Sequence, residues 1–427
     1  MSRALDVSAF IVGALLAPVP ALPNPSLPPW RDPDDLPLPE GIRSAVIQRN
    51  DQAIIAEPSA GGSRRGTARI GARLPWFGAK RGSGCSARWI NVGPHAWICQ
   101  DVLALDANAP LELRGGREGW ASSGLPFQYY FVGRNGSNGY LRLNDAEEVA
   151  PDLDLEPGFA VAIVDQAVKQ GVHYARTHHD QWIPLRDLVP VVPFDFHGHE
   201  VTDDKLDFGW VVEDKAIVLS SPLPLGAGGA AKPARFRQRF EKVDVLEEKT
   251  GKGAAYYRIG PTEWLRARDV RRPTVSPRPS SLRAGERWID IDLVTQTLVA
   301  WEGERPVYAT LVSTGKGLPG TDEATPKGEF RIWVKLESSN MDNLEDEEAK
   351  RYYAIEDVPY VQYFDRGVGL HGAFWHRAFG HVRSHGCVNL APLDAQHLFA
   401  FTSPHLPAGW TAVLPTPVES GTLVRVR

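Results

Sequence analysis

Short runs of alternating apolar and polar residues dominate the chain and predict a mainly β protein. Runs of this kind, bounded by Gly, Pro and Asp, are typical of half-buried strands. Two of them lie in the middle of the chain, at Phe159–Ile163 and Trp210–Val218. Three follow in the last third, at Trp288–Leu293, Val307–Val312 and Phe330–Leu336, and predict a final sheet domain.

One helix is expected within this final domain. Pro392 and Asp394 fit the first turn of a helix that runs to about Phe401, because a first turn needs no N–H from proline and favours negative charge. The acidic stretch Glu337–Lys350 interrupts the strand pattern. It is interpreted as a solvated loop or short surface helix, with a lid over a site as the alternative.

A tryptophan-centred pattern recurs three times before the final domain. Each copy has Trp, an aliphatic residue and an Asp–aliphatic pair four or five residues after the tryptophan. The copies begin at Trp97, Trp182 and Trp264, roughly 80 residues apart. Recurrence at a near-constant interval indicates repeated modules, although chance recurrence in a Trp-rich chain is the alternative.

The sequence around each copy resembles bacterial SH3-like domains, which are small β-barrels. The resemblance predicts modules at residues 64–125, 126–195 and 205–272, which either hold the protein on a substrate polymer or act as spacers. Cys85 and Cys99 fall in the first module. They either form a disulfide after export or remain two buried free thiols.

The N-terminal region has the composition of a leader and a tether. The short apolar run Val7–Leu16 precedes small residues up to Ala21, so residues 1–21 are a candidate signal peptide, with a disordered cytoplasmic tail as the alternative. Nine prolines between Pro18 and Pro39 stiffen the chain, and residues 22–63 are predicted to be a Pro-rich tether.

The remaining boundaries follow from proline content and the end of the strand pattern. A Pro-rich linker is predicted at residues 273–283, a final domain at 284–416 and a C-terminal tail at 417–427.

Composition and charge exclude several classes of protein. With 43% hydrophobic and 23% charged residues, the chain is neither wholly disordered nor a coiled coil. Lys and Arg number 47 against 52 Asp and Glu, so no basic field favours a nucleic acid or an anionic membrane. No later apolar stretch is long enough for a membrane helix, so no stable membrane insertion is expected after signal cleavage.

Histidine gathers near the C-terminus. Five of the chain's 12 histidines lie between His371 and His397, together with Cys387. Their spacing matches no usual zinc-ligand pattern, so no metal or cofactor is expected there. Packing in an aromatic-rich loop is enough to account for the presence of His376 and of His381, each taken alone.

Packing explains the sequence Ser384-His385-Gly386-Cys387 less easily. A cysteine that follows glycine on a tight turn exposes its sulfur beside backbone N–H groups that stabilise an oxyanion, as acyl transfer requires. His371 closes a strand-like stretch, and the intervening loop is long enough to bring its ring to the thiol.

These residues resemble the signature of the YkuD-type L,D-transpeptidase catalytic domain. His371-Gly372, followed after a gap by Ser384–Asn389, carries the resemblance. Other segments that match the family are Ser313–Lys316, Thr325–Phe330, Asp357–Tyr360 with Phe364, and Leu390–Ala395. The resemblance implies a YkuD-like β-sandwich with a short helix. Asn389 stands where many members have arginine.

The resemblance also implies the roles of individual residues. Cys387 is the nucleophile, His371 is the general base, and the carbonyl of Gly372 orients the imidazole. Backbone N–H groups around His385, Gly386 and Cys387 form the oxyanion hole.

The resemblance also implies roles for several neighbouring residues, and for each of them packing is the alternative. Ser384 and His385 shape the turn and contact substrate, Asn389 holds the turn, and Trp375 lines the donor cleft. Either Tyr360 or Tyr363 adds an oxyanion donor, and the sequence does not choose between them.

By resemblance, the donor is a peptidoglycan stem tetrapeptide. Cys387 forms a thioester, D-alanine leaves, and an amine of a neighbouring stem gives a 3→3 cross-link outside the cytoplasmic membrane, in the periplasm or cell wall. One alternative is a carboxypeptidase or endopeptidase in which water resolves the thioester. Another is a non-catalytic cell-wall anchor.

Overall fold

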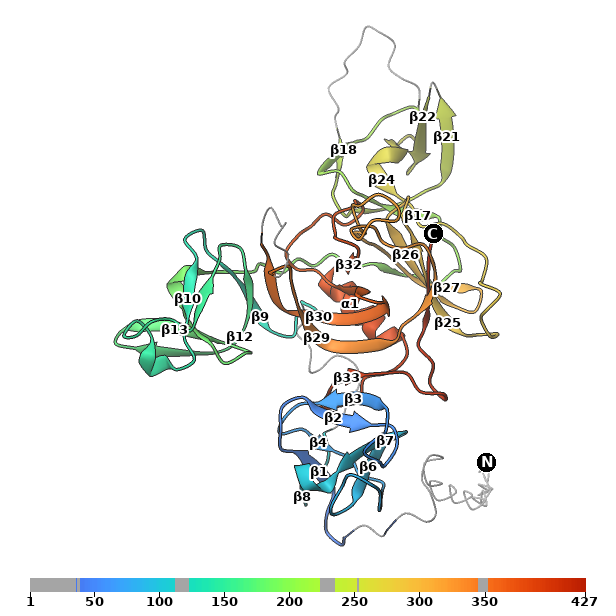
Figure 1. Cartoon of the computed structure of the whole chain (residues 1–427). Helices are drawn as coiled ribbons and strands as arrows, with labels where there is room; N and C mark the ends of the chain where they lie inside the picture. Colours follow the sequence, from blue (N-terminus) through green and yellow to red (C-terminus); the bar gives the residue numbers. More distant parts are fainter. Residues whose placement is uncertain (1–35, 37–38, 112–122, 223–234, 252, 345–351) are drawn as a thin grey trace, which may run out of the picture.

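The computed structural model describes residues 36, 39–111, 123–222, 235–251, 253–344 and 352–427. The described chain is mainly β, as predicted, and contains the single α-helix α1 (Pro392–Phe401) where it was expected. None of the helices in these ranges is long and apolar enough to cross a membrane. Figure 1 shows a central domain with three smaller β units around it. The predicted signal peptide lies outside the described residues.

The central domain is a sandwich of two sheets with α1 packed against it. Ile289 and Leu298 of one sheet share a fully buried core with Leu370 and Val388 of the other and with Leu398 of the helix. The first sheet has the order β16 (His199–Glu200), β27 (Arg305–Leu311), β26 (Thr297–Glu302), β25 (Arg287–Asp292), β34 (Leu423–Val426), β28 (Gly328–Arg331). The second contains β29 (Val334–Asp342), β30 (Ala354–Asp365), β31 (Val368–Gly372), β32 (Val388–Leu390) and β33 (Trp410–Val413).

Two buried polar side chains fix the ends of α1. Asp394 in the first turn is completely buried and accepts hydrogen bonds from Tyr308 (2.6 Å) and the backbone N–H of Gly198 (2.7 Å). At the other end, Lys335 Nζ donates to the carbonyls of Phe399 (2.6 Å) and Thr402 (2.8 Å). Burial raises the pKa of Asp394 to about 6 and lowers that of Lys335 to about 7, so these hydrogen bonds, more than charge, hold the helix against both sheets.

The first small unit begins at Ser44, within the range predicted to be tether. Ala45, Ile47 and Ile54 are completely buried in its core, so an apolar strand pattern starts where the proline-rich stretch ends. The disulfide Cys85–Cys99 forms in this unit. Its elements are β1 (Ser44–Ile47), β2 (Gln52–Ile55), β3 (Arg64–Ala68), β4 (Arg73–Leu74), β5 (Gly78–Lys80), β6 (Trp89–Gly93), β7 (Ala96–Cys99), η1 (Gln100–Val102) and β8 (Leu103–Asp106).

The second unit joins the central domain edge to edge. Its longest strand pairs in parallel with β30 at Ala160 and Ile355, while β3 of the first unit pairs with β33. Its elements are β9 (Gln128–Val132), β10 (Ser137–Gly139), η2 (Leu143–Asp145), β11 (Leu153–Leu155), β12 (Ala160–Lys169), β13 (Val172–Thr177), β14 (Trp182–Pro184), η3 (Leu185–Asp187) and β15 (Leu188–Pro190).

The third unit shows what the recurring tryptophan pattern encodes. In all three units the tryptophan strand is followed by a 3₁₀ turn that contains the aspartate, and then by another strand. That the units are SH3-like remains a prediction. The third unit consists of β17 (Phe208–Val211), β18 (Lys215–Ile217), β19 (Phe236–Gln238), β20 (Lys242–Asp244), β21 (Glu247–Gly251), β22 (Ala254–Arg258), β23 (Trp264–Arg266), η4 (Ala267–Asp269) and β24 (Val270–Arg271).

Two segments of the central domain differ from the sequence interpretation. The strand β29 continues through Glu337, because its backbone pairs with β30 on both sides of that residue, and the Glu337 carboxylate lies 3.3 Å from Arg69 of the first unit. The acidic residues Glu345–Glu348 lie outside the described residues. The segment predicted to be a tail, 417–427, contains β34, which lies between β25 and β28.

Removal of residues 417–427 is therefore expected to unfold the central domain. Leu423, Val424 and Val426 are almost completely buried, and each contributes about 2 kcal/mol, a total comparable to the net stability of a domain. Thermal unfolding followed by circular dichroism tests this. The control is Val418→Ala, because Val418 is 76% exposed. A truncated chain that melts like the full chain would contradict the role assigned to β34.

Candidate active site

Parallel pairing of β31 with β32 brings the predicted nucleophile and base together. In this register Leu370 lies opposite Val388 and His371 lies opposite Asn389. Cys387 is the residue immediately before β32. Because side chains two residues apart along an extended chain share a face, the thiol and the imidazole project from the same face as diagonal neighbours.

The imidazole of His371 is held in one orientation. The side chain is 2% exposed, its Nδ1 lies 3.2 Å from the carbonyl oxygen of Gly372, and its ring stacks on Trp375 with the centroids 5.7 Å apart. Nδ1–H donates to that carbonyl, which leaves the Nε2 lone pair available as a base. Burial lowers the pKa of His371 to about 4, so the ring is neutral near pH 7.

The thiol of Cys387 is protonated in the resting protein. Burial raises its pKa, an effect that the backbone N–H of Gly369 partly offsets. The sulfur lies 3.6 Å from the carbonyl oxygen of Gly367, which accepts from the thiol. Nucleophile and base are thus both neutral at rest. The sequence interpretation, in which the histidine forms the thiolate, therefore describes the state after a proton has moved from Cys387 to His371.

The turn before Cys387 depends on glycine. Gly386 has φ of 123°, and a Cβ there would meet the carbonyl oxygen of Asp322 at 3.1 Å. Thr325 Oγ1 donates to the carbonyl of Gly386 at 2.7 Å. Ser384 Oγ donates to the carbonyl of Cys387 and accepts from the N–H of Gly386 at 3.3 Å. The Gly386 N–H is therefore engaged, and the N–H groups of His385 and Cys387 are the better oxyanion candidates.

The ring of His385 lies on the outer side of this turn. Its Nε2 is 3.0 Å from Lys316 Nζ, which also pairs with Glu323 at 3.3 Å. Burial and the Lys316 ammonium lower the pKa of His385, so the neutral ring accepts from Lys316. The ring also stacks on Tyr353 with the centroids 5.8 Å apart, and its Nε2 lies 3.8 Å from Glu323. Sequence reasoning missed Lys316, Glu323 and Tyr353 as neighbours, because only the fold brings these three segments together.

Asn389 holds the loop beyond His371. It is 4% exposed, and its amide lies 2.9 Å from His376 Nε2, while Nδ1 of that ring accepts from the N–H of Ala378. Because Nδ1 accepts, the ring proton is on Nε2, and the amide atom facing it is the oxygen. Asn389 positions this loop from within the core instead of reaching toward a substrate.

The two candidate tyrosines differ in what they face. Tyr360 is completely buried and packs against Phe399, so it does not contact a substrate as an oxyanion donor would. Tyr363 is half-buried. Desolvation and, to a smaller extent, the charge of Cys387 raise its pKa, while a hydrogen bond with Ser339 lowers it. Tyr363 is therefore the tyrosine of this pair that faces the thiol.

Comparison with known families finds one family model that matches this domain. Residues 286–426 match the family model of YkuD, the L,D-transpeptidase catalytic domain. The YkuD match covers about a third of the chain and includes β34. No curated protein sequence matches the chain.

Several solved structures are similar over the YkuD domain. A mutant L,D-transpeptidase of Enterococcus faecium has 25% identity over 34% of this chain and 50% of its own, with a TM-score of 0.25. The catalytic domain from E. faecium L,D-transpeptidase has 25% identity over 34% of this chain and 100% of its own, with a TM-score of 0.25. L,D-transpeptidase 3 from Mycobacterium tuberculosis has 18% identity over 41% of this chain and 78% of its own, with a TM-score of 0.27. The chain thus spans half the length of the first of these.

A basic cavity of about 780 Å³ adjoins the YkuD site. Trp375 lines it and also stacks on His371, so this one side chain connects the cavity to the imidazole, whereas His371 and Cys387 themselves do not line it. Asp214 pairs with Arg239 at 2.8 Å, so the remaining basic groups leave a positive balance suited to carboxylates. The cavity is lined by Asp214, Lys215, Gln238, Arg239 and Phe240 of the third unit and by Trp375, His376, Arg377, Ala378 and Arg383 of the YkuD domain.

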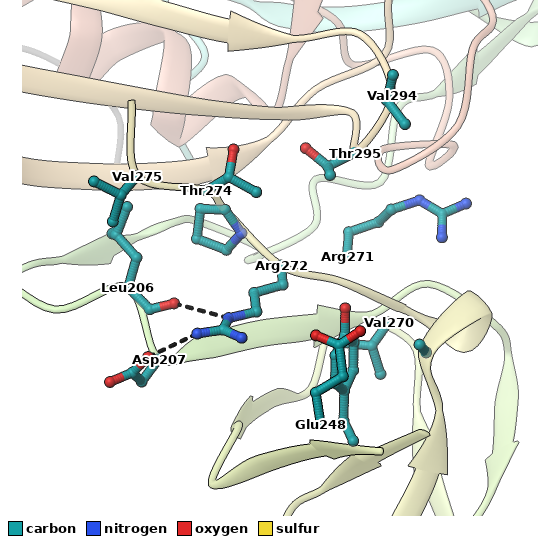
Figure 2. A pocket seen from close by; sticks show the side chains of 13 residues that line it. Leu206, Asp207, Glu248, Val270, Arg271, Arg272, Thr274, Val275, Val294 and Thr295 are labelled. Carbon is teal, nitrogen blue, oxygen red and sulfur yellow. Dashed lines mark hydrogen bonds and ion pairs between the residues drawn. The ribbon is translucent and has the colours of Figure 1, made fainter. Parts of the chain in front are cut away.

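A separate cavity of about 400 Å³ lies on another side of the third unit (Figure 2). There Arg272 donates to Asp207 at 2.7 Å and to the carbonyl of Leu206 at 3.2 Å. None of the predicted catalytic residues lines it, so this cavity is not part of the YkuD site.

The neutral resting state predicts how Cys387 reacts with alkylating agents. Because its pKa is raised, the thiolate fraction at pH 7 is below about 1%, so alkylation should be slow at neutral pH and rise toward pH 10. Intact mass measured after iodoacetamide treatment at several pH values checks this. The control is Cys387→Ala, which should gain no adduct because Cys85 and Cys99 are bonded. A rate that is already constant from pH 5 upward would show a resting thiolate–imidazolium pair instead.

Proposed function

We propose that the protein is an L,D-transpeptidase that acts on peptidoglycan stem tetrapeptides through a thioester on Cys387. The observation that carries the proposal is the β31–β32 register, which supports a common face for Cys387 and for His371, the histidine whose Nδ1 donates to the Gly372 carbonyl. The YkuD family match supports the same reaction class.

Acylation begins with a proton transfer. Nε2 of His371 accepts the proton from Cys387 Sγ as the sulfur attacks the carbonyl carbon of the third stem residue. The carbonyl oxygen becomes an oxyanion, and the backbone N–H groups of His385 and Cys387 donate hydrogen bonds to it. The C–N bond to D-alanine then breaks, His371 returns its proton to the leaving amine, and a thioester remains.

Deacylation uses the same groups in reverse. An amine of a neighbouring stem attacks the thioester carbonyl while His371 Nε2 takes a proton from it. The C–S bond breaks, the sulfur is protonated again, and a 3→3 cross-link is formed. No step requires a cofactor.

The basic cavity gives the stem peptide a place to bind. Three of its cationic groups, Lys215, Arg377 and Arg383, have no ion pair among the described residues and suit the carboxylates that stem peptides carry. Since Lys215 belongs to the third unit, that unit takes part in substrate binding beside the YkuD domain.

Where the protein acts follows from the substrate. Peptidoglycan lies outside the cytoplasmic membrane, so we place the protein in the periplasm or cell wall, where the Cys85–Cys99 disulfide is stable. In this proposal the small β units hold the enzyme on its polymeric substrate.

The central test is incubation with disaccharide tetrapeptide, followed by intact-protein mass and product analysis. The expected result is an acyl adduct and cross-linked dimers for the wild type, and neither for Cys387→Ala or His371→Gln. His381→Gln is the matched control, because that histidine faces the carbonyl of Val212 and should leave activity intact. Tripeptide monomers without dimers would identify a carboxypeptidase. No adduct and no product with several stem types would favour a wall-binding anchor.

The two tyrosines of β30 provide a second test. We expect Tyr363→Phe to lower kcat by about 100-fold, the effect of losing one oxyanion donor, and Tyr360→Phe to leave kcat unchanged. Initial rates at saturating tetrapeptide measure both. Equal rates for Tyr363→Phe and the wild type would remove Tyr363 from the oxyanion site.

A further inference from the structure

A second cluster of reactive side chains lies where the second unit meets the YkuD domain. His178 and His179 follow β13, and Asp357 lies in β30. His178 Nδ1 and His179 Nε2 lie 3.1 and 3.2 Å from the same carboxylate oxygen, Asp357 Oδ2. The three atoms all lie within 4.8 Å of one another. Ligand atoms from two parts of the chain thus converge on one point.

These separations suit a tetrahedral metal ion. Zinc bonds to nitrogen and oxygen are about 2.0 to 2.2 Å long, which places neighbouring ligand atoms roughly 3.3 Å apart. Two imidazoles and one carboxylate form a ligand set that zinc uses in proteins, with a fourth position for water.

The carboxylate is oriented by its own hydrogen bonds, as a metal ligand requires. Ser338 Oγ donates to Oδ1 of Asp357 at 2.7 Å, so the other oxygen, Oδ2, faces the two rings. The backbone N–H of Asp357 donates to Asn340 Oδ1 at 2.9 Å, and the ring of His178 stacks on Phe127 with the centroids 4.6 Å apart. Such outer contacts hold first-sphere ligands in position.

Two further carboxyl groups lie near the cluster, and solvent reaches it. Glu337 and Glu356 interact electrostatically with the histidines, but burial raises the pKa of both, and Arg69 pairs with Glu337, so the ligand atoms themselves must hold the ion. The side chains of His178 and His179 are 47% and 41% exposed, so an ion can enter from solvent, while Asp357 is 6% exposed.

We propose that His178, His179 and Asp357 form a zinc site that joins the second unit to the YkuD domain. The sequence pattern pointed to no metal here, because it directed attention to the histidines around Cys387. The bound ion ties the turn after β13 to β30, the strand that carries Tyr363. The site does not depend on the proposed transpeptidase reaction.

Zinc binding to the full-length chain tests the proposal. The protein is free of affinity tags, its disulfide is kept oxidised, and Cys387→Ser is the background, so that no thiol competes for the ion. Calorimetric titration with zinc chloride and native mass spectrometry should give about one ion per chain. Cobalt substitution should show d–d absorption without a thiolate charge-transfer band.

Variants separate the site from its surroundings. His179→Ala and Asp357→Asn should lower zinc affinity by at least about 100-fold, and Ser338→Ala by about 10-fold. His173→Ala, an exposed histidine on β13, is the matched control and should bind like the background protein. Circular dichroism confirms that each variant is folded, and His178→Gln replaces Asp357→Asn if that buried change unfolds the chain.

Two outcomes would overturn the proposal. One is the absence of zinc binding in the background protein, which would leave only two imidazoles hydrogen-bonded to one carboxylate. The other is binding that His179→Ala does not weaken, which would place the ion elsewhere.

Discussion

Parallel pairing of β31 with β32 positions the reactive side chains, and burial on both faces maintains it. Leu370, Val388 and Leu390 are at most 1% exposed. Short parallel strands have few hydrogen bonds and are found where both faces of the sheet are covered. Here α1 covers one face of the second sheet, and the polar anchors Asp394 and Lys335 hold that helix in place. The geometry of Cys387 and His371 thus depends on residues that never contact a substrate.

The low polarity that stabilises this pair also sets its chemistry. Burial disfavours charge on both groups, so the thiol and the imidazole remain neutral until a substrate brings an electrophile. The Gly372 carbonyl selects the tautomer, and the N–H of Gly369 supports developing charge on sulfur. A protein built in this way limits side reactions of its single free cysteine among the described residues.

Residue types and local order predicted the mainly β fold and the helix at Pro392–Phe401, and the structure has both. The catalytic roles of Cys387 and His371 stay a prediction. Sequence did not choose between Tyr360 and Tyr363, because β30 departs from simple alternation. Tyr360 has φ of 61°, and the pairing of β30 with β31 shifts register between Tyr363 and Asp365. Counting residues along such a strand therefore does not assign faces.

Local sequence patterns also did not predict the contacts between segments that lie far apart in the chain. The cluster of His178, His179 and Asp357 joins residues almost 180 positions apart. The Pro-rich composition before Pro39 obscured the strand that begins at Ser44, and β34 was too short to stand out as a strand. Each of these features depends on a pairing partner elsewhere in the chain.

The pairing of β3 with β33 has a consequence for synthesis. Residues 64–68 emerge from the ribosome long before their partner at 410–413. Until that partner is made, the first unit has an open strand edge, which is prone to pair with other chains. The contact joins segments far apart in the sequence, so it is a high-contact-order event that forms slowly. The junction between the first unit and the YkuD domain therefore cannot close until the segments between β3 and β33 have been synthesised.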